Sequence, residues 1–317
     1  MMTKKPDTPV AIPAANRFSR AARKKPILDP QRPSWATLLM FLLPAVALLI
    51  VFRLTPIGIS IGGSFTSQSL LGETAFDGLG NYKELFSDPS FWNSVYVTLL
   101  FNVIINPLQI FVAFIMALLV FAPGRFLTFF RVSFFLPMTM STALVAVMWN
   151  LLFDPNLGLV NSILAHTSMG RQGFFFDEDQ ALGSMIWIST WKGAGYYMIF
   201  LLAGLFRISE ELYEAAHVDG ASSWQQLRFI TLPQMKRTFL FVFVADTTVN
   251  LLFFAPVFII TRGGPNGATD TLMYRAYESS FTFVDWGRAL SLSCILLALV
   301  AIVACAQMLF FKPGEGE

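Results

Sequence analysis

The chain has 317 residues, of which 55% are hydrophobic and only 13% are charged, and its formal net charge is +2 at pH 7. Soluble domains carry about twice that share of charged residues, so this composition excludes an ordinary soluble protein. Disordered chains are poor in apolar residues, so a largely disordered protein is excluded as well.

The charged residues are unevenly placed and leave six long apolar segments. Because the hydrocarbon core of a bilayer is about 30 Å thick and a helix rises about 1.5 Å per residue, a run of about 18 or more apolar residues predicts a transmembrane helix. The predicted spans, in chain order, are residues 36–61, 93–121, 130–152, 183–206, 238–260 and 289–311. We therefore expect an all-α membrane protein with six transmembrane helices.

Lysine and arginine residues in the connections predict the orientation of these spans. The tail of residues 1–35 and the connection 207–237 are rich in basic residues, whereas the connections 62–92 and 153–182 are mainly acidic. Basic connections stay on the cytoplasmic side, so both termini and residues 312–317 are predicted to be cytoplasmic. We expect the basic tail mainly to anchor this topology, with contact to anionic membrane lipid as the alternative.

The connection 207–237 has the pattern of a helix, a tight turn and a second helix. Ser209 is a candidate N-cap of the first helix, and Gly220 suits the left-handed position that ends it. Ser222 and Ser223 open two overlapping Ser-x-x-Gln capping boxes for the second helix, which Pro233 would end unless it opens the next span. Antiparallel helices need only about 2–8 connecting residues, so this length favours a docking element over a simple connector.

Within this connection stands EAA-x-x-DGA, followed by I-x-LP. It resembles the cytoplasmic coupling motif of permease subunits in ATP-binding-cassette (ABC) importers. The matching residues are Glu214, Ala215, Ala216, Asp219, Gly220, Ile230, Leu232 and Pro233. Leu227 departs from the pattern, because carbohydrate-type members usually have an aromatic residue there, and we expect the change to alter packing rather than role.

Other segments resemble the carbohydrate-type branch of this family, and in particular its maltose- and glycerol-phosphate-type first permease. These segments are GLGNY (78–82), DP-x-FW (88–92), FFLP (134–137), FDP-x-x-G (153–158) and TRGGP (261–265) with TDTL (269–272). Together the similarities cover most of the chain from about Pro44 onwards.

The resemblance implies a type I ABC importer permease bundle with a cytoplasmic coupling-helix hairpin, located in a bacterial inner membrane. It implies a heterodimer with a second permease, two ATPase subunits that bind ATP and magnesium, and a soluble binding protein that delivers a sugar or sugar-like solute. Residues 214–220 would dock on an ATPase. The chain lacks the G-x-x-x-x-G-K-[ST] phosphate loop, so we expect no catalytic residue and no cofactor on it. His166 and His217 have no partners at metal-ligand spacing, so no metal site is predicted, and nothing indicates a nucleic acid partner.

Polar side chains inside two predicted spans are candidates for the substrate pathway, because such groups are costly at membrane depth. In the fourth span these are Lys192, Tyr196 and Tyr197, and in the fifth they are Asp246, Thr247 and Asn250. The tyrosine rings could stack on a sugar face while their hydroxyls bond its rim. In maltose-type permeases the positions matching Tyr196 and Asn250 lie on substrate-contacting helices.

Each of these assignments has a structural alternative. The threonines could form hydrogen bonds between helices, and Asp246 could be a buried partner of Lys192 or of another cation. Asn102, Asn106 and Gln109 of the second span are expected to pack between helices.

Two other classes of membrane protein compete with the importer permease. An ion-coupled secondary carrier predicts inverted repeats and several ion-binding carboxylates within the spans, but Asp246 is the only carboxylate well inside one. A membrane enzyme needs a nucleophile, base or metal cluster at one depth, and the sequence shows none. The sequence does not identify the solute.

Overall fold

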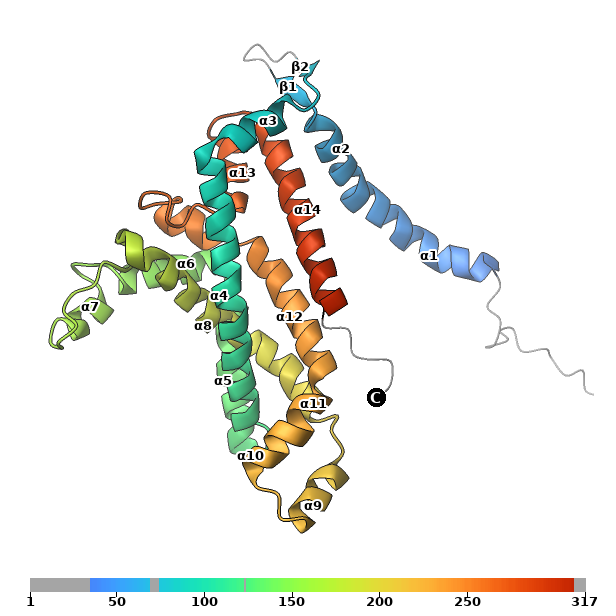
Figure 1. Ribbon diagram of the computed structural model, residues 1–317, viewed down its shortest axis with the longest axis vertical. Coiled ribbons are helices and arrows are strands. Elements are labelled where there is room, and N and C mark those ends of the chain that lie inside the picture. The colour runs from blue at the N-terminus through green and yellow to red at the C-terminus, as the bar shows by residue number, and fades with distance from the viewer. Residues whose placement is uncertain (1–34, 69–73, 123, 311–317) are drawn as a thin grey trace, which may run out of the picture. The chain divides into compact units, whose positions relative to one another are not determined.

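The computed structural model describes residues 35–68, 74–122 and 124–310 (Figure 1). The predicted tails, 1–35 and 312–317, lie outside the described residues except for Trp35. By its internal contacts the chain divides into two compact units, Met1–Pro56 and Ile57–Glu317. Nearly all elements are helices, as the sequence predicts.

The described part of the first unit is one helical run. Helix α1, Trp35–Leu49, continues through a π-helical segment, Ile50–Leu54, into α2, Thr55–Gly63, which crosses the boundary between the units. The run Leu38–Gly63 has 26 residues, enough to cross a membrane.

In the second unit, the end of α2 is followed by a two-stranded antiparallel sheet, β1 (Thr66–Gln68) and β2 (Thr74–Phe76), in which Ser67 pairs with Ala75. Its helices follow in this order: α3 (Gly80–Ser87), α4 (Pro89–Leu119), α5 (Arg125–Thr139), α6 (Thr142–Leu152), α7 (Leu159–Leu164), α8 (Glu178–Leu205), α9 (Glu210–Val218), α10 (Ser223–Gln226), α11 (Leu232–Gln234), α12 (Lys236–Leu251), α13 (Leu272–Phe281) and α14 (Trp286–Phe310). Three short helices of other types are a 3₁₀ turn at Phe174–Phe176 and π-helical segments at Leu227–Thr231 and Val257–Thr261.

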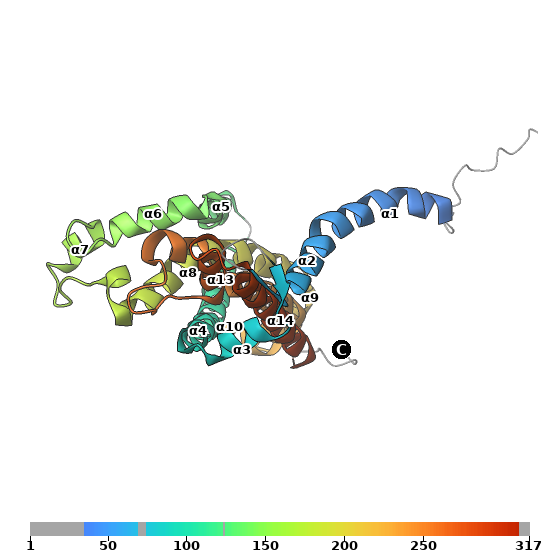
Figure 2. The ribbon, with the colours of Figure 1, turned by 90° about the horizontal axis from the view of Figure 1, so that it is seen from above.

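Helices α4, α8, α12 and α14 form the packed bundle of this unit (Figure 1). The largest core cluster joins α4, α8 and α12 through residues that include Ala117, Met198, Leu201 and Val242. These residues lie in the halves of the helices that the sequence predicts to be on the cytoplasmic side. Figure 2 shows α6 and α7 extending to one side of this bundle. Small residues and a methyl-rich surface let the helices approach closely, which excludes lipid and water from the contact.

Among the described residues, three helices are long and apolar enough to cross a membrane, and a bent pair would make a fourth. The three are Leu38–Gly63, Pro89–Leu119 and Trp286–Leu309, and the pair is α5 with α6, which meet at 95°. The third predicted span is therefore broken after Thr139, two residues beyond Pro137. Pro137 lies inside α5, and a proline disturbs the turn that precedes it, so it does not by itself account for a break that follows Thr139; the chain turns there because Met140 is extended.

The remaining two predicted spans are helical, but their crossing of a membrane stays a prediction. Helix α8 has 28 residues, yet it carries a lysine, two tyrosines and several glycines in its middle. Helix α12 has 16 residues and ends at Leu251, short of the predicted end at 260, before the irregular segment that leads to the π-helical turn. About 20 residues are needed to span a bilayer, so α12 alone is too short.

An ionic cluster ties the first turn of α4 to α13 and α14. Arg275 binds Asp270 at 2.5 Å and lies 3.6 Å from Asp88, while Arg288 bonds both Asp88 and Glu84. Asp88 also caps α4, because its Oδ1 accepts from the Ser90 backbone N–H at 2.8 Å. The cluster therefore holds together the starts of α4, α13 and α14, which are predicted to lie on the outer side of the membrane.

Candidate functional site

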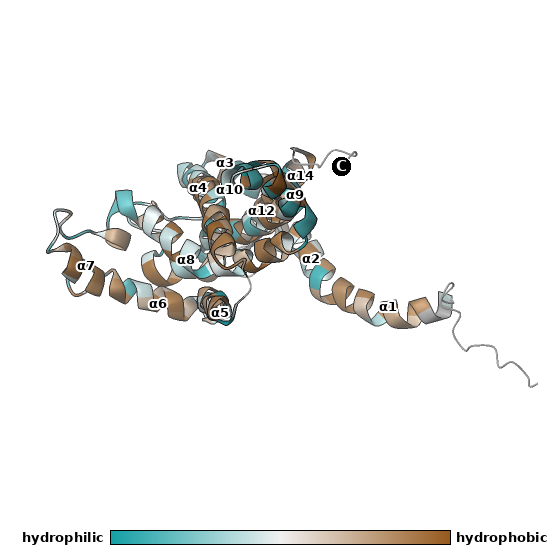
Figure 3. Cartoon of the chain, turned by 90° about the horizontal axis from the view of Figure 1, so that it is seen from below, coloured by the Kyte–Doolittle hydropathy of each residue, from teal (hydrophilic) through white to brown (hydrophobic). Residues whose placement is uncertain are grey.

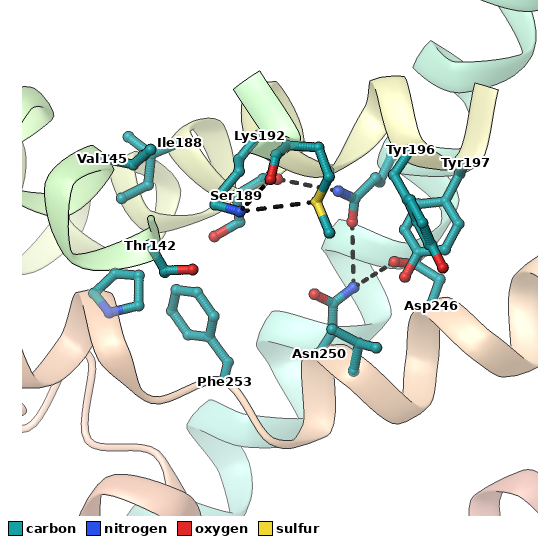
Figure 4. Close-up of a pocket in the computed structure, with 15 residues that line it drawn as sticks. Thr142, Val145, Ile188, Ser189, Lys192, Tyr196, Tyr197, Asp246, Asn250 and Phe253 are labelled. Atoms are coloured by element: carbon teal, nitrogen blue, oxygen red, sulfur yellow. Dashed lines mark hydrogen bonds between the residues drawn. The ribbon is translucent and has the colours of Figure 1, made fainter. Parts of the chain in front are cut away.

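A cavity of about 300 Å³ lies between α8 and α12, and residues of α4, α5 and α6 also line it (Figure 4). Its polar walls are formed by Lys192, Tyr196 and Tyr197 of α8 and by Asp246 and Asn250 of α12. The structure therefore brings together five of the six residues that the sequence singled out for a substrate pathway.

The α8 wall combines a cation with aromatic rings. Lys192 and Tyr196 are four residues apart and so lie on one face of the helix. The rings of Tyr196 and Tyr197 are 5.2 Å apart and nearly perpendicular. Lys192 Nζ lies 3.4 Å from the Met138 carbonyl oxygen, at the end of α5, where the partial negative charge of a helix C-terminus favours a cation.

The α12 wall presents a fully buried carboxylate. Asp246 Oδ1 accepts a hydrogen bond from Asn250 Nδ2 at 2.9 Å, one helical turn further on. The Tyr197 hydroxyl points towards this carboxylate (Figure 4), but Asp246 Oδ2 makes no well-formed hydrogen bond within the described part of the chain. A buried acceptor without a hydrogen-bond partner lowers the stability of the folded protein unless a ligand or a water molecule donates to it.

A polar network behind the α12 wall joins α12 to α4 and α14. Asn250 Nδ2 also donates to Asn106 Oδ1 at 2.8 Å, and Asn106 Nδ2 donates to Thr247 Oγ1 at 2.9 Å. Thr247 Oγ1 accepts in addition from Gln307 Nε2 at 2.8 Å. Thr247 is buried in this network and does not line the cavity, which agrees with the alternative of hydrogen bonding between helices.

Other polar residues also line the cavity, and among them Gln109 and Ser189 were not predicted from the sequence to do so. Gln109 of α4 was expected only to pack between helices, and its amide does donate to the Ser189 backbone oxygen of α8 at 3.0 Å. Ser189 itself has a buried hydroxyl without a hydrogen-bond partner among the described residues, and it also faces the cavity. Serine in an apolar segment is too common to be recognised from the sequence.

Glycines of α8 bring the neighbouring helices close enough to shape this cavity. A Cβ atom on Gly195 would lie 1.8 Å from the Phe134 backbone oxygen of α5, and one on Gly193 would lie 1.9 Å from Gln109 Nε2 of α4. The Gln109 side chain could move away from a larger residue at position 193, but the Phe134 backbone could not, so Gly195 determines how closely α5 packs on α8.

The second candidate site is the hairpin formed by α9 and α10. Helix α9 ends with Gly220 in left-handed geometry at φ +75°, and the Ala221 N–H donates to the Ala216 oxygen, as a glycine C-cap requires. Ser222 caps α10 in a capping box with Gln225, as predicted. Ser209 occupies the N-cap position of α9, but its side chain does not bond the helix backbone.

This hairpin presents its motif residues to solvent. Glu214, Ala215, Asp219 and Gly220 are exposed, and Figure 3 shows α9 as a hydrophilic element beside largely apolar helices. The side opposite the turn is joined to the π-helical segment that leads into α11, because the hydroxyls of Tyr213 and Thr231 form a hydrogen bond of 2.8 Å. Leu232 packs against the main core cluster, and Pro233 is at the start of α11, so the chain continues through it.

Ile230 is half-buried beside this anchor. Leu227, the position at which the sequence departs from the carbohydrate-type pattern, also packs against the main core cluster. An apolar side chain of another shape therefore fills the same place.

The fold, the polar cavity between helices and the exposed hairpin define a helical membrane transport subunit. The chain belongs to the family of binding-protein-dependent transport system inner membrane components, whose model matches residues 109–312. Membership of this family sets aside the secondary carrier and the membrane enzyme.

Relatives extend the similarity over most of the chain. A probable ABC transporter permease protein of Pyrococcus horikoshii is 31% identical over 286 residues, covering 89% of this chain and 98% of the relative. The lactose transport system permease protein LacF of Rhizobium radiobacter is 33% identical, covering 87% and 93%. The sn-glycerol-3-phosphate transport system permease protein UgpA of Brucella abortus is 31% identical, covering 86% and 93%.

Solved structures share the fold. A bacterial alginate ABC transporter in complex with an alginate pentasaccharide-bound periplasmic protein contains a chain with a TM-score of 0.77 and 21% identity, covering 87% of this chain and 96% of that one.

Proposed function

We propose that this chain is one permease subunit of an ABC importer for a sugar-like solute, and that it forms the translocation pathway with a second permease. The observation that carries the proposal is the cavity between α8 and α12, where tyrosine rings, a lysine, an amide and a carboxylate converge. Sugars present apolar ring faces together with hydroxyls that donate and accept, and these walls match both. The names of the lactose and glycerol-phosphate relatives support the same solute class.

The α9–α10 hairpin is the proposed contact with the motor. One of the two ATPase subunits, which bind ATP and magnesium, docks on residues 214–220, and Ile230, Leu232 and Pro233 hold the hairpin against α12. A force on the exposed turn reaches the cavity because the Tyr213–Thr231 hydrogen bond and the Leu232 contact couple the hairpin to the bundle. The chain itself hydrolyses no ATP and binds no metal in this proposal.

The remaining partners follow from the same role. A soluble binding protein delivers the solute at the outer face, a role for which the alginate transporter structure with its periplasmic protein is the supporting example. The chain resides in a bacterial inner membrane with both termini in the cytoplasm, and the basic connections support this orientation.

The direct test is affinity purification of the tagged full chain from its native membrane in mild detergent, with mass-spectrometric identification of the proteins that accompany it. We expect a second permease and an ATPase subunit in stoichiometric amounts. The complex, reconstituted in proteoliposomes with its binding protein, should take up solute only with ATP inside. Recovery of the chain alone at good yield, or uptake driven by an ion gradient without ATP, would contradict the proposal.

A further inference from the structure

A second cavity, of about 550 Å³, lies between the start of α8 and the arm formed by α6 and α7 (Figure 2). Gln180, Ser184 and Trp187 of α8 and Trp149 of α6 are among the residues that line it. They are distinct from the residues that line the cavity between α8 and α12, the transport cavity. Helix α8 begins on the side that the sequence predicts to be outer. This outer cavity therefore lies where a solute arrives before it reaches the transport cavity.

Aromatic rings line much of the outer cavity. Phe153 stacks on Phe174 with ring centroids 4.2 Å apart, and Trp149 meets Phe153 at 4.9 Å in an edge-on arrangement. Trp187 is 57% exposed, so much of its ring surface is accessible to a ligand. Flat rings with a polar handle suit a ligand that is apolar on one side and polar at its edge, as a sugar ring is.

Polar groups lie among these rings. The Trp149 indole N–H is buried and has no hydrogen-bond partner within the described residues. Ser184 is buried as well, and its hydroxyl can donate and accept. A hydrocarbon chain in the cavity would leave the indole N–H without an acceptor, which is unfavourable for a buried donor. A sugar hydroxyl accepts from it, so the walls favour a sugar over a lipid chain.

Hydrogen bonds hold the loop that closes the outer cavity in place. Asn161 Nδ2 donates to the backbone oxygens of Asp154 and Gln172 at 3.1 and 2.8 Å, and its Oδ1 accepts from the Gln172 N–H at 2.8 Å. Gln180 Oε1 accepts from the Phe174 N–H at 3.0 Å, which ties the loop to α8. A wall that is already ordered binds a ligand without the entropy cost of ordering it.

The two cavities follow one another along α8. Ser184, Ile188 and Lys192 are spaced by four residues, so they form one row on the helix. Ser184 lines the outer cavity, whereas Ile188 and Lys192 line the transport cavity. At about 1.5 Å per residue, Ser184 and Lys192 are about 12 Å apart along the helix axis. This arrangement is the one expected of two subsites on a single route.

We propose that the outer cavity is a second sugar-binding subsite, which receives a sugar unit before that unit enters the transport cavity. Trp187 packs on the ring face of the sugar, the Trp149 N–H donates to one of its hydroxyls, and Ser184 binds another. The inference rests on the proposed function, because it takes the solute to be sugar-like and its movement to be inward.

The test is equilibrium dialysis of a radiolabelled sugar against the full complex, purified with its accompanying subunits and without its binding protein. The probe is the pentose, hexose or disaccharide, from a labelled panel, that the complex takes up fastest in proteoliposomes with its binding protein and ATP. We expect two classes of site. Trp187→Leu should weaken the outer class about tenfold, as loss of a tryptophan anchor does. Ser184→Ala should weaken it about fivefold, which corresponds to about 1 kcal/mol for one hydrogen bond.

Two further variants separate the sites from general effects. Trp92→Leu is the matched control, because Trp92 is 52% exposed on the same predicted side but does not line the outer cavity, and it should leave both classes unchanged. Asp246→Asn should weaken the class of the transport cavity and spare the outer class.

Two results would overturn this inference and leave the proposed function in place. The first is sugar binding by Trp187→Leu that equals that of wild type or of Trp92→Leu, while Asp246→Asn still binds more weakly. The second is a lipid chain or a side chain of the accompanying permease in the outer cavity, seen by cryo-electron microscopy of the complex with the sugar. If the complex takes up no sugar of the panel with ATP, the proposed function itself fails.

Discussion

Lys192 and Asp246 line the same cavity, but they are not paired with each other. Lys192 Nζ is directed to the Met138 carbonyl oxygen, and Asp246 Oδ1 to the Asn250 amide. Within the described residues no ion pair joins Asp246 to any cation, so the structure does not support the alternative of a buried pair. The Lys192 ammonium and the Asp246 carboxylate in this one cavity therefore keep capacity for a ligand that bears both donors and acceptors.

Replacement of Asp246 should reduce solute uptake. In Asp246→Asn the side chain keeps its size, but the charged acceptor is lost, and a hydrogen bond to a charged group contributes about 1.5–3 kcal/mol. We expect uptake at subsaturating solute to fall about tenfold or more in proteoliposomes, with unchanged assembly of the complex. Thr248→Val is the control, since the Thr248 hydroxyl bonds the Val244 oxygen of its own helix and is not part of the cavity wall. Equal uptake by wild type and Asp246→Asn would exclude contact between this carboxylate and the solute.

Lys192 should matter most for solutes that carry a negative charge. Lys192→Met keeps a long apolar stem but removes the cation, so a carboxylate or phosphate in the cavity would lose its partner. The expected result is a larger loss of uptake for an anionic solute than for its neutral analogue, measured with the same complex. Unchanged uptake of the anionic solute would show that Lys192 serves only the Met138 carbonyl at the end of α5.

The coupling hairpin and the cavity differ in how far the sequence alone predicts them. The Gly220 C-cap and the Ser222 capping box depend on residues a few positions apart, so their pattern is legible in the sequence. The cavity depends on tertiary contacts, such as that of Gly195 with Phe134, which join residues far apart in the sequence. The spacing of apolar residues along the chain indicates where helices form, but it does not indicate which helices contact each other.

The spans show the same limit. Apolar runs predict where helices lie, but the third run gives no sign that it breaks by 95° beyond Pro137. A proline in a long apolar segment is compatible with a mild kink as well as with a break. The fifth predicted span, 238–260, likewise gives no indication that α12 ends at Leu251, because the residues that follow are also apolar.

Gly220 should be essential for coupling and not for insertion of the protein into the membrane. Its φ of +75° is unfavourable for any residue with a Cβ atom, at a cost of about 1 kcal/mol or more, so Gly220→Ala should distort the turn after α9. We expect solute-stimulated ATP hydrolysis to fall several-fold while the amount of chain in the membrane is unchanged. Gly170→Ala imposes similar strain at φ +64°, but in the predicted outer loop, and should leave coupling intact. If both variants behave alike, the effect belongs to strain and not to docking.

Gly195 should be needed for stability of the bundle. The Cβ atom of Gly195→Ala would lie 1.8 Å from the Phe134 oxygen, so α5 must move away from α8. Overpacking of this kind costs about 1–3 kcal/mol. Thermal unfolding in detergent should show a clear loss of stability. Gly183→Ala on the same helix has no atom within 4 Å of the added carbon and should be nearly neutral. A neutral Gly195→Ala would mean that α5 does not pack on α8 as closely as the structure shows.

Asp88 should make the outer ionic cluster sensitive to acid. Burial acts to raise the pKa of Asp88, but the Ser90 N–H and the guanidinium groups of Arg288 and Arg275 outweigh it and hold that pKa below its ordinary value. A carboxyl group with a depressed pKa in the folded state stabilises the protein above its unfolded pKa of about 3.9, and this contribution is lost as pH falls through the folded value.

The stability of the purified complex should therefore fall more steeply below about pH 4 in wild type than in Asp88→Asn. Asparagine caps a helix about as well as aspartate, so this variant removes the charge and leaves the start of α4 capped. The difference at neutral pH should be up to about 1 kcal/mol, as for a partly exposed ion pair. Glu84→Gln is the control, because 67% of the Glu84 side chain is exposed and, among the described residues, its ion pair is with Arg288. Identical acid profiles for wild type and Asp88→Asn would show that the cluster does not hold α4 to α13 and α14 through this charge.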